Sequence, residues 1–472
     1  MTVAFILPKN HMIPQNILAG WRRPSSLPVS QDSCRVWLRT FVAVLCTFPA
    51  LLAARAQDTN APSLEYSATR VFSQAVETNL PPLPPVYVPQ AAPAPPLTGT
   101  RQLYAPTPVP LPALPPLLRW GLLTIQPHLY YGLSYGDGIQ ATAGQPTNSF
   151  MNELDPGVLL RWGDHWSLDY TPMLRFYSSS DLRNTFDNAV TLSGGTTYED
   201  WKFGLGQTYA SSSDPIIETA SQTDQQTFST LLSADWRMNS KTSLELGLSQ
   251  NLRMFDQSSG GQQLNDYNSW STMDWLNYQF WPGFGAAIGA GFEYVNVSVG
   301  PDLTSEQIQG RITWRVIKKL SFVLSGGAQD MQFLGSGAPN LISPVFSLSV
   351  QYSPFEATTL SVSGYSGVTP SYYQDQVTEG TSINAGLHQR LLGKLYLDLS
   401  GGYANSTYHA SSTAPASTLS NYDTTFFSAG LSAAVLKRGT VSVFYSVNMN
   451  SSGAAIYNYT TSMVGCSLSY RY

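Results

Sequence analysis

The sequence predicts an all-β fold: a single large antiparallel transmembrane β-barrel of about 18 strands (16–18), preceded by a disordered Pro-rich segment. Three observations predict it. From residue 119 to the end, apolar and polar residues alternate, as in strands with one apolar and one polar face. Tight turns and longer polar loops separate these stretches in turn. Charged residues make up only 12% of the 472 residues, against roughly a quarter in a soluble domain.

The first segment, residues 1–56, has the features of a secretion signal. Arg35 and Arg39 precede an apolar stretch at 41–52, and an Ala-Arg-Ala tripeptide at 54–56 has the form of a cleavage site. Cleavage there removes two of the three cysteines, so no disulfide framework is expected. The remaining chain has 19 basic and 29 acidic residues, a formal net charge of −10. It has no basic patch of the kind that binds nucleic acid.

Residues 57–118 are predicted to form a Pro-rich periplasmic linker. Between Pro81 and Pro116 there are 14 prolines, which cannot sustain helix or sheet hydrogen bonding. An extended spacer of this length reaches on the order of 100 Å. Two interpretations stay open: a docking segment for a periplasmic or cell-wall partner, or an unselective spacer.

The barrel is expected to occupy residues 119–472. Eight tight turns are predicted at residues 163–165, 197–200, 239–241, 281–283, 317–319, 353–356, 391–394 and 437–439. Longer polar loops are predicted between the hairpins, for example at 136–149, 211–225, 367–379 and 409–421. Eight hairpins, an opening strand near 125–135 and a closing strand make 18 strands. An even number places both ends of the barrel on the periplasmic side.

Alternation assigns the two faces of each strand. Leu168 and Tyr170 point to one side of a predicted strand and Asp169 points to the other. An Arg or Lys that faces lipid in mid-bilayer costs roughly 2–4 kcal/mol, so the charged face must line the lumen. Lumen charges either tune the selectivity of a pore or pair with one another, and pairing is expected for Asp235, with Arg237 or a cross-strand neighbour. The predicted pore-lining residues are Arg161, Asp169, Arg175, Lys202, Asp235, Arg237, Glu245, Glu293, Arg311, Arg315, Arg390 and Asp398.

Aromatic residues recur beside the tight turns, for example Trp162, Trp201 and Trp236, where a girdle at the membrane interface is expected. A large antiparallel β-sandwich would share the alternation and the turns. It would not explain the alternation of short turns with long loops, the scarcity of charge or an aromatic C terminus. The barrel is therefore the preferred fold.

The final strand alternates to the last residue, and the chain ends on an aromatic side chain. This pattern resembles the closing strand of bacterial outer-membrane β-barrels. The resemblance implies that the barrel-assembly machinery recognises this strand. The residues that carry the predicted insertion signal are Val464, Cys466, Leu468, Tyr470 and Tyr472.

A wider resemblance rests on the stretches 166–172, 187–190 and 194–201, which read WSLDYTP, DNAV and GGTTYEDW. Together with the strand pattern of 120–472 they resemble the outer-membrane β-barrel porin family of Gram-negative bacteria. The resemblance implies an outer-membrane location, contact with outer-membrane lipid and a channel. It does not imply a named solute.

Catalytic and metal-binding patterns are not expected. The four histidines beyond residue 56, at 128, 165, 388 and 409, fall on separate predicted elements and do not form a metal-ligand cluster. Gly285, Gly289 and Gly291 are interpreted as small lumen-side residues rather than a phosphate-binding loop. We therefore expect no cofactor, no metal and no enzymatic activity; a hydrolase acting at the rim of the barrel is the least favoured reading.

The sequence thus favours a porin-like channel for passive diffusion of small hydrophilic solutes across the bacterial outer membrane. An alternative stays open: a structural or envelope-anchoring barrel associated with export or polysaccharide machinery, held there by the Pro-rich segment. The solute, the openness of the lumen and the oligomeric state are not determined by sequence.

Overall fold

A computed structural model of the chain describes residues 118–137, 147–163, 165–213, 215–216, 221–256, 264–371, 373–412, 421–453 and 458–471. The predicted signal segment, the predicted linker up to residue 117, and Asp164 and Tyr472 lie outside these residues. In the described part of the chain, no helix is long and apolar enough to cross a membrane.

The described residues form β-strands joined by turns and loops. Their bounds are β1 Leu118–Trp120, β2 Leu123–Gly136, β3 Ser149–Trp162, β4 Trp166–Tyr177, β5 Thr185–Tyr198, β6 Trp201–Ser212, β7 Pro215–Ile216, β8 Ser221–Gln222, β9 Gln225–Arg237, β10 Thr242–Phe255 and β11 Tyr267–Trp281. They continue with β12 Phe284–Val297, β13 Leu303–Ile317, β14 Leu320–Phe333, β15 Leu341–Phe355, β16 Thr358–Pro370, β17 Gln376–Leu392, β18 Leu395–Ala410, β19 Tyr422–Ala434, β20 Gly439–Ser452 and β21 Tyr459–Arg471.

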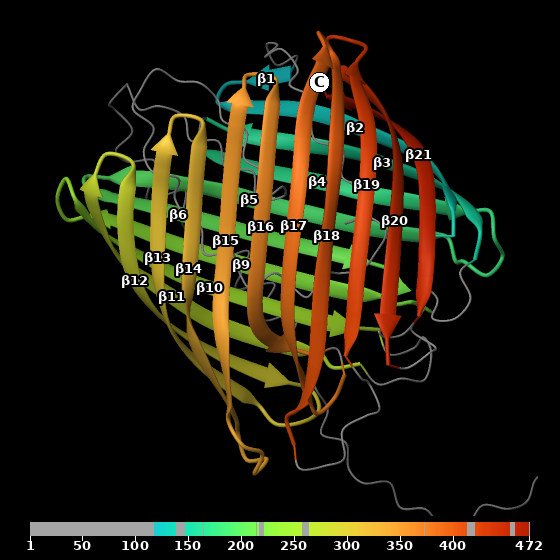
Figure 1. Cartoon of the computed structure of the whole chain (residues 1–472). Coiled ribbons are helices and arrows are strands. Elements are labelled where there is room, and N and C mark those ends of the chain that lie inside the picture. The colour runs from blue at the N-terminus through green and yellow to red at the C-terminus, as the bar shows by residue number, and fades with distance from the viewer. Residues whose placement is uncertain are drawn as a thin grey trace, which may run out of the picture. The chain divides into compact units, whose positions relative to one another are not determined.

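Eighteen of these strands close into one antiparallel ring. Each long strand pairs with the next along the chain, and β2 pairs with both β3 and β21. Closure removes the sheet edge, whose unpaired backbone groups would each cost several kcal/mol in hydrocarbon. The closed ring confirms the predicted fold class and strand number, and all eight predicted tight turns join strands of one hairpin (Figure 1). The short strand β1 pairs with the start of β2, and β7 and β8 form a separate small hairpin.

One predicted loop is wrong. Residues 367–379 were expected to be a polar loop, but the strand pairs β16–β17 extend to Pro370↔Val377, which leaves only residues 371–375 as the connection. The stretch holds Gly367, Pro370, Ser371 and Asp375, residue types that favour turns in isolation. Here a cross-strand ladder and buried contacts with other strands hold them in extended form.

Outward and inward residues alternate along each strand as the pattern predicts. On β13, Ile308 is 67% exposed and points outward, whereas Arg311 is 4% exposed and points into the ring. Large apolar side chains cover the outer wall all round, including Phe186, Ile288, Ile342 and Leu468. An outer wall of this kind is stable only against lipid, because the same apolar area in water would be unfavourable.

Aromatic side chains form contacts at both ends of the outer wall. Beside the short turns, Trp201 stacks on Trp236 with ring centroids 5.4 Å apart, and Trp281 stacks on Phe284 at 4.4 Å. Nearer the long loops, outward-facing tyrosines donate hydrogen bonds to a neighbouring strand or loop. Examples are Tyr294 to Asp302 and Tyr403 to Asp423. Two such belts mark the two membrane interfaces.

The residues of the predicted insertion signal lie on the outer face of β21. Val464 is 53% exposed, Leu468 is 42% exposed and Cys466 is an exposed free thiol. Tyr470 shares this face by alternation, while the terminal residue of the signal lies outside the described part. Recognition of the strand by the assembly machinery stays a prediction.

Candidate functional site

The lumen is the candidate site, because the inner face of the ring carries the polar and charged side chains. All twelve predicted pore-lining residues occupy positions whose parity points into the ring. They do not form one cluster. Some meet in pairs with other inner-face side chains, most of the rest line the end of the barrel beside the short turns, and Glu293 lies in the half near the long loops.

The first buried group is centred on Arg175 of β4. Its Nε donates to Glu153 Oε1 at 3.1 Å, and its Nη1 donates to Asp187 Oδ2 at 3.0 Å. The three side chains are 3%, 7% and 1% exposed in that order. The Ser213 hydroxyl donates to the second carboxylate oxygen of Asp187. A buried guanidinium with two carboxylate partners is fixed in place rather than free in the pore.

The second buried group surrounds Arg311 of β13. Its Nη2 donates to Glu245 Oε2 at 2.7 Å and to Asn277 Oδ1 at 2.6 Å, and its guanidinium lies 4.4 Å from the ring centroid of Trp275. To reach β10 and β11 it crosses β12, where the residue paired with it is Ala287. The small side chain of Ala287 therefore lets the long Arg311 side chain cross β12. Ala287 shares the inner face of this strand with Gly285, Gly289 and Gly291, the glycines interpreted from sequence as small lumen-side residues.

Two histidine–carboxylate pairs account for two more of the predicted residues. His128 Nε2 lies 2.9 Å from Asp169 Oδ1, and His388 Nδ1 lies 2.7 Å from Asp398 Oδ1. The His128 side chain passes over Gly157 of β3 to reach β4. Only glycine leaves room for it, because a Cβ at this position would lie 2.1 Å from the imidazole. A third pair, His409 with Glu379, lies near the long loops.

The other predicted residues lie mostly beside the short turns. Lys202 of β6 faces Asp235 of β9 directly across the strand register, and Asp235 faces Glu245 on its other side. Asp235 thus has two cross-strand neighbours, one basic and one acidic, and its pairing with Lys202 or with Arg237 stays a prediction. Glu293 is an exception, because it lies in the half of β12 near the long loops, between Ser271 and Ser305 in the register. The residues within a few positions of a short turn are Arg161, Lys202, Arg237, Arg315 and Arg390.

The mouth on the long-loop side is crossed by part of the hairpin β16–β17, residues 367–380, which we call the inward hairpin. β14 and β15 stay paired to Met331↔Leu341, but β15 and β16 stay paired only to Phe346↔Ser366. The pairs of β16 with β17 continue beyond this point. The hairpin therefore separates from β15 at Ser366, while β17 stays paired with β18 to Gln376↔Ala410. Figure 1 shows the end of β16 curving away from β15.

The burial of its side chains shows that the inward hairpin lies inside the ring. Val368 has the same parity as the outward-facing Leu360, and Val377 has that of the outward-facing Ile383. Both valines are nevertheless buried, at 3% and 0% exposure. They pack with inner-face residues of β12, β13 and β14, namely Val295, Leu303, Met331 and Phe333. The hairpin has folded into the ring, so its former outer face now covers the inner wall.

Polar contacts hold the inward hairpin at three points. The Val368 N–H donates to Gln329 Oε1 at 3.4 Å, and Arg253 Nη2 donates to the Ser371 carbonyl oxygen at 3.3 Å. Tyr373 forms an isolated antiparallel bridge with Leu264, in the connection between β10 and β11. These contacts join strands that are far apart in the ring.

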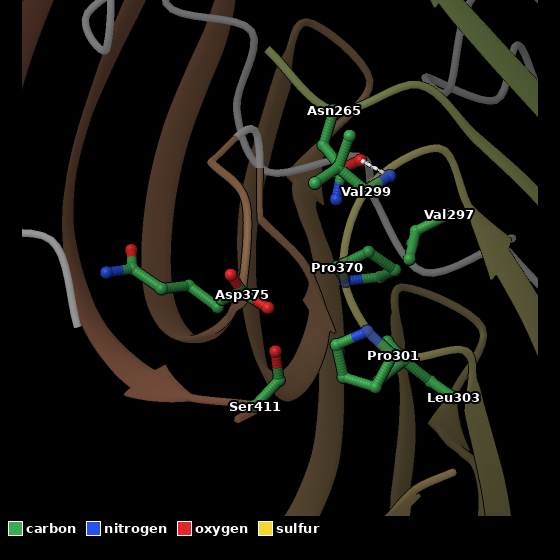
Figure 2. Close-up of a pocket in the computed structure, with 9 residues that line it drawn as sticks. Asn265, Val297, Val299, Pro301, Leu303, Pro370, Asp375 and Ser411 are labelled. Atoms are coloured by element: carbon green, nitrogen blue, oxygen red, sulfur yellow. Dashed lines mark hydrogen bonds between the residues drawn. The ribbon is translucent and has the colours of Figure 1, made fainter. Parts of the chain in front are cut away.

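A small pocket lies where the inward hairpin meets the ends of β12 and β13 (Figure 2). Figure 2 shows Pro370 of the hairpin next to Pro301, and Asp375 and Ser411 on the other side. The Asn265 amide oxygen accepts the Val299 N–H at 3.1 Å and ties the two neighbouring loops together. The pocket is too small to serve as a solute site, and it marks the contact between hairpin and rim.

Charge is distributed unequally along the barrel axis. Among the described residues, and with Asp274 at the centre of β11 counted in neither half, the strand halves beside the long loops, with those loops, hold 3 basic and 15 acidic residues, a net charge of −12. The halves beside the short turns, with their turns, hold 14 basic and 7 acidic residues, a net charge of +7. A solute that crosses the barrel therefore passes from an acidic mouth to a basic one.

Several residues of the site were not predicted. Glu153, Asp187 and Arg253 have the inward parity that identified the other charges, so the same rule applied to every strand would have found them. Gln329 and the inward hairpin carry no such signal, because their roles depend on a strand leaving the wall. In the described ranges, no three His, Cys, Asp or Glu side chains lie close enough to hold a metal ion.

The sequence matches no known protein family and no curated protein. Solved structures resemble it weakly: OccAB3 of Acinetobacter baumannii with a TM-score of 0.40, 8% identity, and coverage of 74% of this chain and 99% of that chain. For OccK3 (OpdO) of Pseudomonas aeruginosa the TM-score is 0.41, the identity 11%, and the coverage 74% and 95%. For the copper transporter OprC the values are 0.41, 11%, 71% and 62%, so this chain spans less than two thirds of OprC.

The architecture of the chain rests on its own strand pairing. The ring is closed by β2 and β21, its outer wall is apolar between two aromatic belts, and its inner face is charged. Only lipid accommodates such an outer wall, and closed barrels of even strand number are the β-structures that span the bacterial outer membrane. The chain is an outer-membrane β-barrel protein.

Proposed function

We propose that the protein is a passive diffusion channel for small hydrophilic solutes, narrowed at its long-loop mouth by the inward hairpin. The observation that carries the proposal is the charged and polar inner face of an 18-strand ring. A ring of about 16–18 strands is wide enough to leave an aqueous channel unless something fills it. The proposal includes the absence of an enzymatic role.

The inward hairpin supports a channel of limited width. It occupies the inner side of the β12–β14 wall, and its buried valines and the Arg253 contact fix it there. A fixed hairpin sets a constant size limit, whereas a hairpin that moves would make the conductance fluctuate. We propose the former, because the segment is anchored on both its apolar and polar sides.

The charge distribution favours cations and neutral solutes at the acidic long-loop mouth. Solute charge is selected by the local potential, and that potential extends about 8 Å at physiological ionic strength. Anions would be repelled there, although the basic half of the pore attracts them from the other side.

The test is single-channel conductance of the refolded full-length protein in a planar bilayer, with liposome swelling by uncharged sugars. Discrete openings and sugar entry are expected. Val377→Asp places a charge in the apolar contact of the inward hairpin, and it should raise conductance and admit larger sugars. Thr208→Asp, on the lumen face of β6 away from the hairpin, adds the same charge as a matched control.

A folded barrel that is electrically silent and excludes all sugars would overturn the proposal. Such a result would direct attention to the alternative, an anchoring barrel associated with export or polysaccharide machinery. That role predicts recovery of periplasmic partners that is lost when residues 60–116 are deleted. Hydrolysis of phospholipid or peptide by the purified barrel would contradict the non-enzymatic part of the proposal, provided that a preparation from cells with the empty vector shows no such activity.

A further inference from the structure

The outer wall carries a row of polar side chains halfway along three neighbouring strands. Gln207 of β6 pairs directly with Thr230 of β9, and Thr230 pairs directly with Gln250 of β10. Each lies five to eight residues from either end of its strand. The row therefore lies near the middle of these three strands, one outward position from the aromatic pair Tyr209–Phe228 and directly across from Trp270 of β11.

Alternation places the row on the lipid side. Gln207 shares a face with Phe203, Thr230 with Leu232 and Gln250 with Leu248, and these three apolar residues are 43%, 43% and 36% exposed. At comparable positions on the opposite wall, the outward side chains are apolar. They are Leu399, Leu431, Val443 and Val464.

The polar residues hydrogen-bond along the wall. The Thr230 hydroxyl donates to Gln207 Oε1 at 2.6 Å, and Gln250 Nε2 donates to Asn268 Oδ1 at 3.2 Å on β11. A carboxamide has two N–H donors and an acceptor oxygen, so these bonds leave each amide with further capacity.

The same wall carries an outward-facing acidic residue. On β11, Asp274 lies on the same face as Asn268, with Trp270 and Thr272 between them, and its Oδ1 accepts the Gly247 N–H at 3.2 Å. The β10–β11 register has no pair at this point, since it passes from Glu245↔Trp275 to Leu248↔Thr272. The Asp274 carboxylate thus accepts a backbone N–H that has no cross-strand carbonyl partner on β11, on the side of the sheet that faces lipid.

The wall beside the row is shaped for close approach. The central outward residues of β12, β13 and β14 are small, namely Ala290, Gly310 and Gly326, and Gly310 pairs directly with Gly326. The exposed Ile288 and Ile308 flank them. A Cβ added at Gly310 would meet nothing within 4 Å. Small residues at an intramembrane surface let two backbones approach one another.

Geometry selects the partner. Two copies of this chain in one membrane share their orientation, so the symmetry axis that relates them runs along the membrane normal. Each residue then meets residues at its own depth. With strands ~4.8 Å apart and tilted by ~40°, Gln207 and Gln250 differ in depth by only about 6 Å. The row would face its own copy, and carboxamides are self-complementary because each both donates and accepts.

We propose that the outer face of β6, β9, β10 and β11 is a contact surface for a second copy of this chain. The polar row gives the contact its register and depth, because a displaced copy would leave amides against hydrocarbon. The small residues of β12–β14 lie at the margin of the contact. The proposal is independent of whether the lumen conducts.

The first test is cross-linking of the full-length protein in outer membranes. In a Cys466→Ser background, Thr230→Cys places a thiol at the centre of the row, and Val443→Cys places one on the opposite outer wall as a matched control. A short thiol-reactive cross-linker should join copies at Thr230→Cys at least tenfold more than at Val443→Cys. Equal cross-linking at both positions would overturn the proposal.

The second test separates contact from lipid exposure. The triple variant Gln207→Leu, Thr230→Val and Gln250→Leu should become monomeric in mild detergent while its heat-modifiable barrel migration is retained. If the row faces lipid only, the wild-type protein is already monomeric, and the apolar variant is no less stable than it. That pair of results would refute the contact. Retained heat-modifiable migration of the triple variant excludes misfolding as the reason why it is monomeric.

Discussion

Small residues on the inner wall decide which charged side chains meet. Gly157 and Ala287 each lie on a strand between two partners, and in both cases a long side chain crosses above them. The His128–Asp169 and Arg311–Glu245 pairs therefore join strands that are not hydrogen-bonded neighbours. Alternation along the strands identified Arg311, Glu245 and Asp169 as inner-face residues. Their contacts also depend on the small residue of the strand between the partners, which alternation does not reveal.

Gly157→Ala should break the His128–Asp169 contact, because the new Cβ would lie 2.1 Å from the imidazole. The expected loss of unfolding free energy is about 1–3 kcal/mol, the cost of overpacking, measured by urea titration of the folded barrel in vesicles. In a His128→Ala background the same change should cost almost nothing. An equal loss in both backgrounds would contradict this account.

Glu245→Gln should destabilise the barrel, because Arg311 is 4% exposed and loses its charged partner. Hydrogen bonds to charged groups are worth about 1.5–3 kcal/mol. A double-mutant cycle with Arg311→Met measures the coupling. A coupling energy near zero would show that Asn277 and Trp275 hold the guanidinium without the carboxylate.

The loop residue Asp302 gives the outer rim a pH dependence. Partial burial alone would raise the pKa of its carboxyl, but hydrogen bonds from Tyr294, Asn296 and the Val297 N–H outweigh it and hold the pKa below the usual value. A carboxyl with a lowered pKa contributes stability above its unfolded pKa of ~4 and loses it as pH falls through the folded value. The protection factor of the Val297 amide, which corrects the exchange rate for its intrinsic fall toward acid pH, should therefore decrease at acid pH, and Asp302→Asn should remove that decrease.

At the scale of elements, the strand pattern predicted most of the fold. Eight turns, the strand number and the inward parity of the charges follow from a period of two, since a strand that stays in the wall must obey it. The inward hairpin could not be predicted this way. Val368 and Val377 follow the outward pattern, and their burial depends on inner-wall residues more than 40 positions away in the sequence, such as Leu303.

Gln329→Ala should loosen the inward hairpin without unfolding the barrel. The Val368 N–H loses its acceptor, and an unsatisfied buried group costs about 1–3 kcal/mol. Amide hydrogen exchange should increase roughly tenfold or more at residues 367–369 and stay unchanged in β19 and β20. Unchanged exchange at 367–369 would show that the apolar contact alone holds the hairpin.

At the scale of the whole barrel, the opposed charges of its two halves should make ion flow asymmetric. With net charges of −12 and +7 on the two described halves, mobile ions accumulate in the pore at one voltage polarity and are depleted at the other. The currents at equal and opposite voltages should differ in ~0.01 M salt, where the Debye length is ~30 Å, and converge in ~1 M salt, where it is ~3 Å. Equal currents at low salt would contradict this prediction.

The seam between β2 and β21 has a consequence for how the barrel forms. It joins His128 to Arg471, a separation of 343 residues, whereas a neighbouring hairpin closes a loop of about 20. Each doubling of a loop adds ~0.6 kcal/mol of closure entropy, so the seam costs about 2.5 kcal/mol more than a hairpin. Nine residue pairs offset that amount easily. The seam is thus slow to form rather than weak, and nascent chains must keep both terminal strand edges apart from other chains until translation ends.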